Sequence, residues 1–175
     1  KELVKPAIKA AESGKVKFHP ERWQEAYLNR LRNERDWTLS RQIWWGHQIP
    51  IWYCACEGEK KSVFAGKTPP KIKCAGCKTE WKRDPDVLDT WFSSALWPFA
   101  VFGWPDKTDD LPRFYPTSVL STARDIISIW VAKMVFSGLE FMGKEPFSDV
   151  IIHATILTKD GKRMSKSLGT GIDPM

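Results

Sequence analysis

The sequence contains no run of apolar residues close to the roughly 20 that a membrane-spanning helix requires. It also has no segment that combines the charged start and the apolar middle of a secretory signal peptide. It shows no internal repeat and no low-complexity tract. These absences exclude a membrane-spanning helix and a repeat architecture, and we expect a cytoplasmic protein that contacts no membrane.

The chain has no initiating methionine, since it begins at Lys1, and it ends in the turn-like residues 171–175. We therefore expect part of a longer protein, although 175 residues suffice for one domain with its own core. The net charge of +6 favours acidic partners such as nucleotides or nucleic acid. Because the basic residues are spread along the chain, charge alone selects no partner.

Cysteine is scarce, and the four that occur form two close pairs: Cys54 with Cys56, and Cys74 with Cys77. Without secretory features, such pairs favour a metal over disulfides. Four thiolates suit tetrahedral Zn2+, and the intervening residues can close into a zinc ribbon. The site would be structural, because all four ligands come from the protein. The first pair is one residue shorter than the usual spacing, and four reduced cysteines without metal remain the alternative.

Hydrophobic spacing predicts three helices and three strands. The helices are expected over residues 3–12, 19–35 and 125–141, and the strands over residues 49–53, 115–120 and 150–157. The last two strands are predicted to be buried, with the helix between them as a crossover in a parallel α/β sheet. Thr122 and Asp125 resemble a capping box for that helix, and Gly143 can end it.

Residues 159–169 form a short loop rich in cations, hydroxyls and glycines. Its cations are Lys159, Lys162, Arg163 and Lys166. Ligands of parallel sheets bind past the carboxyl ends of the strands, so this loop should meet residues 121–125 and 153–157 at one crevice. The cations could then stabilise the charge that grows on a departing pyrophosphate. A solvated basic turn is the alternative.

Two further segments leave alternatives open. Residues 36–53 mix tryptophans with Arg41 and Gln42, a combination that can stack on and hydrogen-bond bases but that is equally typical of a packed corner. The basic face of the helix over residues 19–35 is most simply a solvated surface, and a nucleic-acid contact is the alternative. Residues 84–99 are predicted to form a turn and a short helix that ends near Pro98.

Four strings resemble, in order, the valyl type of class I aminoacyl-tRNA synthetases. They are Ser40-Arg-Gln with Trp44-Trp-Gly-His, the stretch from Val87 to Phe99, Thr122 to Trp130 with the following Ile152-His-Ala, and Arg163-Met-Ser-Lys-Ser, which is similar to the KMSKS signature. The resemblance implies the C-terminal half of a Rossmann-like parallel-sheet nucleotide-binding domain with an inserted zinc ribbon. The HIGH motif and the editing domain are absent from this sequence.

The resemblance also implies a domain division. Residues 1–36 would be a helical segment that follows the editing domain, and residues 37–53 would re-enter the catalytic domain. Residues 54–83 would form the zinc-ribbon module, and residues 84–175 the catalytic half with the KMSKS-like loop.

The resemblance assigns roles to single residues. Lys166 and Arg163 would be catalytic, and Trp91, Ile126 and Trp130 would bind the amino acid. The ATP-binding set would be Ala123, Asp125, His153, Met164, Ser165 and Lys166, and the metal ligands would be Cys54, Cys56, Cys74 and Cys77. Ala123 and Ala154 replace family glycines. From the residues alone, Ile126, Trp130 and His153 could equally belong to the core.

The implied reaction is ATP-dependent and Mg2+-dependent activation of valine to valyl-adenylate, followed by transfer to the 3′ end of tRNA(Val). The partners would be ATP, valine, the tRNA acceptor end and the rest of the polypeptide, which would hold the HIGH motif, the editing domain and an anticodon-binding domain. The chain would be inactive alone. The alternatives are an isoleucyl or leucyl enzyme, or a non-catalytic zinc-ribbon module that binds nucleic acid.

Overall fold

The computed structural model describes residues 2–56, 62–165 and 167–171. The chain divides into two compact units, the first formed by residues 1–35 and 95–175 and the second by residues 36–94. Within the described ranges, no helix is both long and apolar enough to cross a membrane.

The first unit is built on a three-stranded parallel sheet with the order β1-β8-β7. Strand β7 (Thr117–Ala123) pairs with β8 (Phe147–His153), and β8 pairs with β1 (Lys17–His19). The crossover between β7 and β8 runs through a 3-10 turn η2 (Arg124–Ile126), a π-helical stretch η3 (Ile127–Val131) and helix α6 (Ala132–Met142). The predicted parallel crossover is therefore confirmed, whereas β1 was not anticipated.

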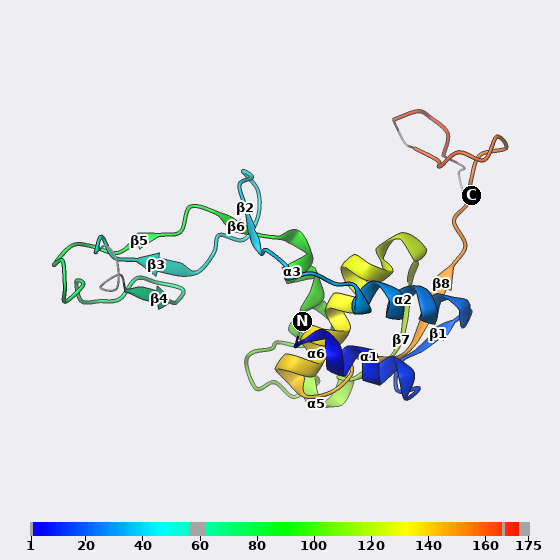
Figure 1. Ribbon diagram of the computed structural model, residues 1–175, viewed down its shortest axis with the longest axis horizontal. Helices are drawn as coiled ribbons and strands as arrows, with labels where there is room; N and C mark the ends of the chain where they lie inside the picture. The colour runs from blue at the N-terminus through cyan, green and yellow to red at the C-terminus, as the bar shows by residue number, and fades with distance from the viewer. Residues whose placement is uncertain (1, 57–61, 166, 172–175) are drawn as a thin grey trace. The chain divides into compact units, whose positions relative to one another are not determined.

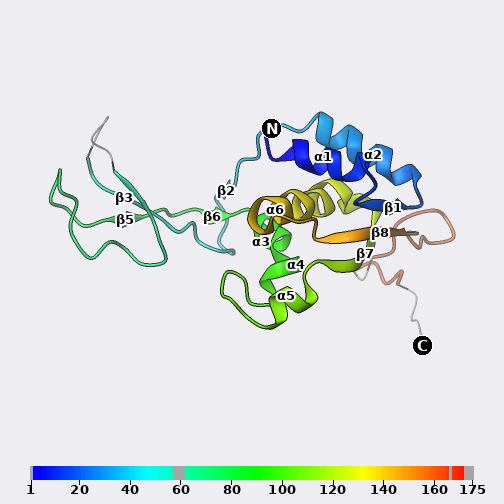
Figure 2. The ribbon, with the colours of Figure 1, turned by 90° about the horizontal axis from the view of Figure 1, so that it is seen from below.

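Helices α1 (Val4–Glu12), α2 (Arg22–Arg32) and α6 lie on one face of this sheet and share its hydrophobic core (Figures 1 and 2). Burial alternates along the strands, because successive side chains point to opposite faces. Leu120, Val150 and Ile152 are buried, while Val119 and Ile151 are exposed.

Residues 150–157 were predicted as a fully buried strand, and this prediction is wrong. Strand β8 begins at Phe147 and ends at His153, and it buries one face only. An apolar run does not reveal how many faces of a sheet are covered. In the described chain the helices cover one face, so Ile151 stays exposed on the other, while Ile156 is exposed beyond the end of the strand.

The ends of the helices follow the sequence in part. Gly143 ends α6 at a φ of 68°, and its N–H donates to the Leu139 carbonyl at 3.1 Å, as predicted. The predicted capping box is wrong, because Ala123 occupies the N-cap position of η2 without a side-chain hydrogen bond. Thr122 is instead buried on the covered face of β7.

Pro98 lies in the first turn of α4 (Trp97–Ala100) rather than ending a helix. A further short helix, α5 (Asp110–Phe114), precedes β7.

The second unit is made of short antiparallel strands. Strand β3 (Ile51–Tyr53) lies between β4 (Val63–Ala65) and β5 (Lys82–Arg83), and β2 (Ser40–Arg41) pairs with β6 (Val87–Leu88). The predicted strand over residues 49–53 is thus confirmed as β3. Helix α3 (Thr90–Ala95) follows β6.

Two aspartates hold the β2–β6 pair together. The buried Asp89 accepts hydrogen bonds from the Trp37 indole at 3.0 Å and from the Trp91 amide at 2.8 Å, and it pairs with Arg41. Asp86 accepts hydrogen bonds from Ser40 and from Gln42, the latter at 2.8 Å. These hydrogen bonds lower the pKa of Asp86 below its ordinary value. Three residues of the Ser-Arg-Gln string therefore serve the local fold.

The two tryptophans that follow this string are not packed. Trp44 and Trp45 are almost fully exposed, so the packed corner expected for residues 36–53 is not what the structure shows at these side chains.

Candidate functional site

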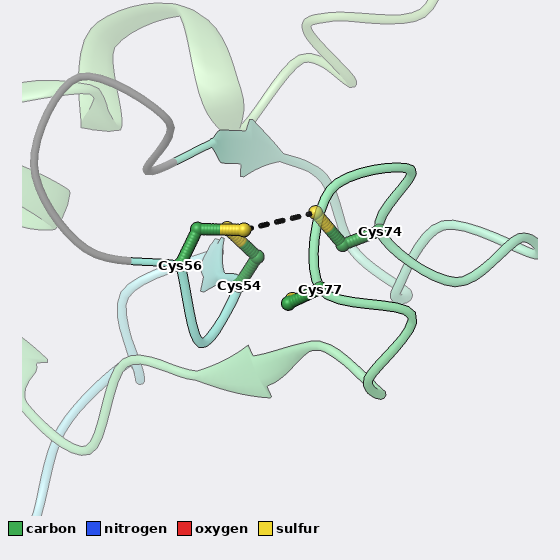
Figure 3. Close-up of side chains that lie close together, drawn as sticks. All are labelled: Cys54, Cys56, Cys74 and Cys77. Carbon is green, nitrogen blue, oxygen red and sulfur yellow. Dashed lines mark hydrogen bonds between the residues drawn. The ribbon is translucent and has the colours of Figure 1, made fainter.

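The four cysteines converge in the second unit, as their spacing predicted. Their sulfur atoms all lie within 4.8 Å of one another (Figure 3). Cys54 follows β3 directly, and Cys74 and Cys77 come from the turn that precedes β5. The Sγ atoms of Cys56 and Cys74 are 3.7 Å apart. Zinc bonds of about 2.3 Å to a tetrahedron of thiolates place sulfurs roughly 3.8 Å apart, so the donor set and the spacing fit Zn2+.

Local hydrogen bonds favour the thiolate form at two of these positions. The Ser62 amide donates to Cys54 Sγ at 3.0 Å, and this bond lowers the pKa of Cys54. Cys77 lies 3.0 Å from the Thr79 hydroxyl, which lowers the pKa of Cys77 to about 6. Contact with Cys77 and burial raise the pKa of Cys56 to about 12. A metal cation reverses that effect, because it deprotonates a coordinating thiol.

The turn that carries the second pair depends on backbone conformation. Lys78 has a φ of 59° and donates its N–H to the Cys74 carbonyl at 2.9 Å. A Cβ on Gly76 would lie 2.9 Å from Cys56 Sγ, so only glycine lets the sulfurs come this close. The residues present therefore fit a structural zinc centre.

A cleft of about 360 Å³ opens at the carboxyl end of β8 in the first unit. Its lining residues come from the start of α2, from η2 and from the segment after β8: Pro20, Arg22, Trp23, Arg124, Ile152, His153, Ala154, Thr155 and Leu157. The Thr155 hydroxyl is buried without a hydrogen-bond partner. Two arginines and a histidine make this cleft suited to an anion.

His153 is exposed on the uncovered face of β8, and its Nδ1 lies 2.9 Å from the Ala154 carbonyl. The alternative of a core histidine is therefore wrong. Ala123, which pairs with His153 in register, has an extended backbone with φ −86° and ψ 152°. Among the described non-glycine residues only Lys78 has a positive φ. The alanines at 123 and 154 therefore adopt their backbone conformations without strain.

The KMSKS-like loop contacts η2 through an ion pair between Arg163 and Asp125. Asp125 also lies 3.9 Å from Arg124. The structure therefore brings Asp125 and Arg163 together beside the end of β7, as the crevice prediction required. Lys166 falls outside the described residues.

Within the loop, a turn closed by Thr158 and Lys162 is followed by one closed by Ser165 and Thr170. The Ser165 hydroxyl is 2.8 Å from that of Ser167, and Met164 is half-buried.

The predicted amino-acid-binding residues fall in different units. Ile126 and Trp130 lie in the first unit, where Trp130 packs against the core and its ring centre is 6.1 Å from that of Trp97. Trp91 lies in the second unit, half-buried at the start of α3. Their assembly into one pocket stays a prediction.

Sequence reasoning missed Arg22 and Trp23 as lining residues of the cleft, whereas Arg124 belongs to residues 121–125, which were predicted to lie at the crevice. Arg124 stands inside the string from Thr122 to Trp130 and was the one with a detectable signal. Arg22 and Trp23 had none, because the parallel pairing of β1 brings them to this edge. The other arginines of α2 fit the solvated face expected there: Arg30 pairs with Glu34 at 3.1 Å, and Arg32 pairs with Glu12 at 3.0 Å.

Solved structures support the fold. A Mycobacterium tuberculosis methionyl-tRNA synthetase in complex with methionyl-adenylate matches 99% of this chain and 28% of its own, with a TM-score of 0.66 and 18% identity. A LeuRS–tRNA–LeuAMS complex from Agrobacterium radiobacter matches 80% of this chain and 22% of its own, with a TM-score of 0.59 and 22% identity. At these identities the likeness shows the fold alone, a Rossmann-like synthetase fold with a parallel sheet.

Sequence relatives point the same way. The valine–tRNA ligase of Carboxydothermus hydrogenoformans is 57% identical and that of Thermotoga maritima 53%, and each alignment covers all of this chain. The chain spans about a fifth of the length of these curated relatives. The family model of class I tRNA synthetases for isoleucine, leucine, methionine and valine matches residues 1–175. Because this model covers the whole sequence, the chain belongs to the class I tRNA synthetases.

Proposed function

We propose that the chain is the second half of the catalytic domain of a valine–tRNA ligase, with its KMSKS-like loop and an inserted zinc module. Support comes from relatives named valine–tRNA ligase, which are 51–57% identical over nearly all of the chain. Their names favour valine over isoleucine or leucine. The complete enzyme would activate valine with ATP to valyl-adenylate, release pyrophosphate, and transfer valine to the 3′ end of tRNA(Val) in the cytoplasm.

One observation carries this proposal: the Arg163–Asp125 contact brings the KMSKS-like loop to the edge of the sheet where His153 lines a cleft. There Arg163 and Lys166 would neutralise the triphosphate, which is the main catalytic need when pyrophosphate departs. Ala123, His153, Met164 and Ser165 would contact the nucleotide. Mg2+ would arrive with ATP and bridge its phosphate oxygens.

The amino-acid pocket would be lined by the apolar side chains that the resemblance assigns to it. Trp91 would contribute one wall and Trp130 another, while Ile126 would limit the size of the side chain. Apolar pockets reject a missing or extra methylene by only about 1–3 kcal/mol, so an editing domain elsewhere in the enzyme would remove near-isosteres.

Zn2+ bound by Cys54, Cys56, Cys74 and Cys77 would act as a structural cross-link for residues 54–83. The described residues of this segment form only short strands, so a bound metal would supply stability that a small core does not. The remaining partners would be the HIGH-containing half, the editing domain and the anticodon-binding domain of the same polypeptide.

The test is exchange of labelled pyrophosphate into ATP by the complete enzyme, with valine, isoleucine and leucine compared at equal concentration. We expect exchange that depends on valine and is at least tenfold slower with leucine. Equal rates with valine and leucine would overturn the assignment.

A further inference from the structure

Asp125 was expected to contact ATP, yet its carboxylate lies between two guanidinium groups. One belongs to its neighbour Arg124, and the other to Arg163 of the KMSKS-like loop. A carboxylate and a phosphate are both anions and repel each other unless a cation lies between them. The geometry therefore gives Asp125 a cationic side chain as its partner.

The position of Asp125 is fixed by the sheet. It stands two residues after Ala123, which pairs with His153 at the end of β7, and it belongs to the short turn η2. The loop, by contrast, is held mainly by its own hydrogen bonds. These join Thr158 to Asp160 and Lys162, and Ser165 to Ser167 and Thr170.

Among the described residues of the loop, 159–165 and 167–169, the Arg163–Asp125 pair is the one ionic contact that reaches outside the loop. Lys162, one residue earlier, pairs inside the loop with Asp160 at 3.2 Å. A bridge between Leu157 and Arg163 places Arg163 against the segment that leaves β8. The neighbouring cations therefore make different contacts: Lys162 pairs within the loop, and Arg163 pairs with Asp125 outside it.

We infer that Asp125 is a positioning residue: it anchors the KMSKS-like loop over the carboxyl edge of the sheet by holding Arg163, and the triphosphate of ATP competes with it for that guanidinium. Guanidinium binds carboxylate and phosphate through the same planar pair of N–H donors, so one exchanges for the other. The competition with ATP rests on the proposed function, whereas the anchoring of the loop does not.

The first experiment measures amide hydrogen exchange of residues 157–163 in the complete enzyme without nucleotide. An exposed ion pair restrains a loop weakly, so Asp125→Asn should speed this exchange about two- to five-fold. Arg163→Gln should do the same, and the double variant should be no faster than either single one. Asp125→Glu should restore slow exchange.

Lys162→Gln provides the matched control, because it removes the same charge one residue away. Its effect on exchange should add to that of Asp125→Asn, since Lys162 pairs with Asp160. Unchanged exchange in Asp125→Asn would overturn the anchor. The anchor would also be overturned if Asp125→Asn combined with Lys162→Gln were as non-additive in hydrogen exchange as Asp125→Asn combined with Arg163→Gln.

The second experiment measures the KM for ATP in pyrophosphate exchange. Asp125→Asn should lower this KM in the wild-type background, because the triphosphate no longer competes with the carboxylate, and should have no effect once Arg163 is glutamine. An equal change in both backgrounds would assign Asp125 to the nucleotide itself and contradict the inference. Failure of the proposed function would appear as absent valine-dependent exchange in the wild type, and the hydrogen-exchange result would still decide the anchor.

Discussion

At the scale of single residues, the close approach of Gly76 to Cys56 has a direct consequence for metal binding. A Cβ at 2.9 Å from a ligand sulfur forces that sulfur to move. Gly76→Ala should therefore weaken zinc binding by about 10- to 100-fold, the range found when the surroundings of a metal ligand are disturbed. Zinc competition with a coloured chelator measures this affinity. Gly171→Ala is the control, since a Cβ there meets nothing within 4 Å.

Lys166 lies outside the described residues, but the sequence gives its charge, and the proposed mechanism depends on that charge. Lys166→Ala in the complete enzyme should lower the rate of valine activation by about 10²–10³, the cost of losing one group that stabilises the transition state. Arg163→Lys should have a milder effect, because the charge is kept while the planar fork is lost. Pre-steady-state formation of valyl-adenylate gives both rates. A fall with Lys159→Ala as large as with Lys166→Ala would argue against a specific role.

At the scale of elements, the sheet of β3, β4 and β5 has strands of only two or three residues. Such strands contribute little stability by themselves, so the cysteine cluster should hold them in register. Cys74→Ser should release the metal and increase hydrogen exchange in β3 and β4. Metal analysis of protein purified under reducing conditions should find one Zn2+ per chain in the wild type. Disulfides in place of metal would refute the zinc site.

Strand β1 is the other weakly held element. It contributes three residues at a sheet edge, and His19 Nε2 lies 2.7 Å from the Asp149 carboxylate of β8. The Ser148 hydroxyl and then His19 lower the pKa of Asp149 below its ordinary value. A lowered pKa means stability that is present above the unfolded value of about 3.9 and is lost as pH falls through the folded pKa.

We therefore expect Asp149→Asn to speed hydrogen exchange of residues 17–19 at pH 7 and to make progressively less difference as the pH falls through the lowered pKa of the folded carboxylate. Exchange at several pH values, corrected for its intrinsic pH dependence, is the measurement. Asp160→Asn serves as the comparison, because Asp160 bonds within the loop at Thr158 and Lys162. An effect on β1 that does not diminish at all as the solution is acidified would contradict this account.

At the scale of the whole molecule, the proposed chemistry needs cations and donors on both sides of the triphosphate. Under the proposed function this chain would supply one side, with Arg163 and Lys166, and its sequence has no HIGH motif for the other. The 175-residue chain alone should therefore catalyse no valine-dependent pyrophosphate exchange, and at most bind nucleotide weakly. Robust exchange by the purified chain would show that the catalytic groups are differently distributed. The complete enzyme, assayed in parallel, is the positive control.

The sequence by itself determined what depends on residue type and short spacing. Two cysteine pairs predicted a four-sulfur cluster, and apolar strands on either side of a helical pattern predicted a parallel crossover. Both are local signals, because ligand chemistry and hydrophobic periodicity act over a few residues.

The tertiary structure alone decided which distant segments meet. It paired the three-residue β1 with β8, covered one face of the sheet, and brought Arg22 and Trp23 to the cleft. Within the crevice that the sequence predicted, it selected Arg163 as the partner of Asp125, and it made Asp89 the shared partner of Trp37 and Arg41. These contacts arise from the packing of segments far apart in the chain, and no periodicity or spacing along the sequence encodes the distance between them.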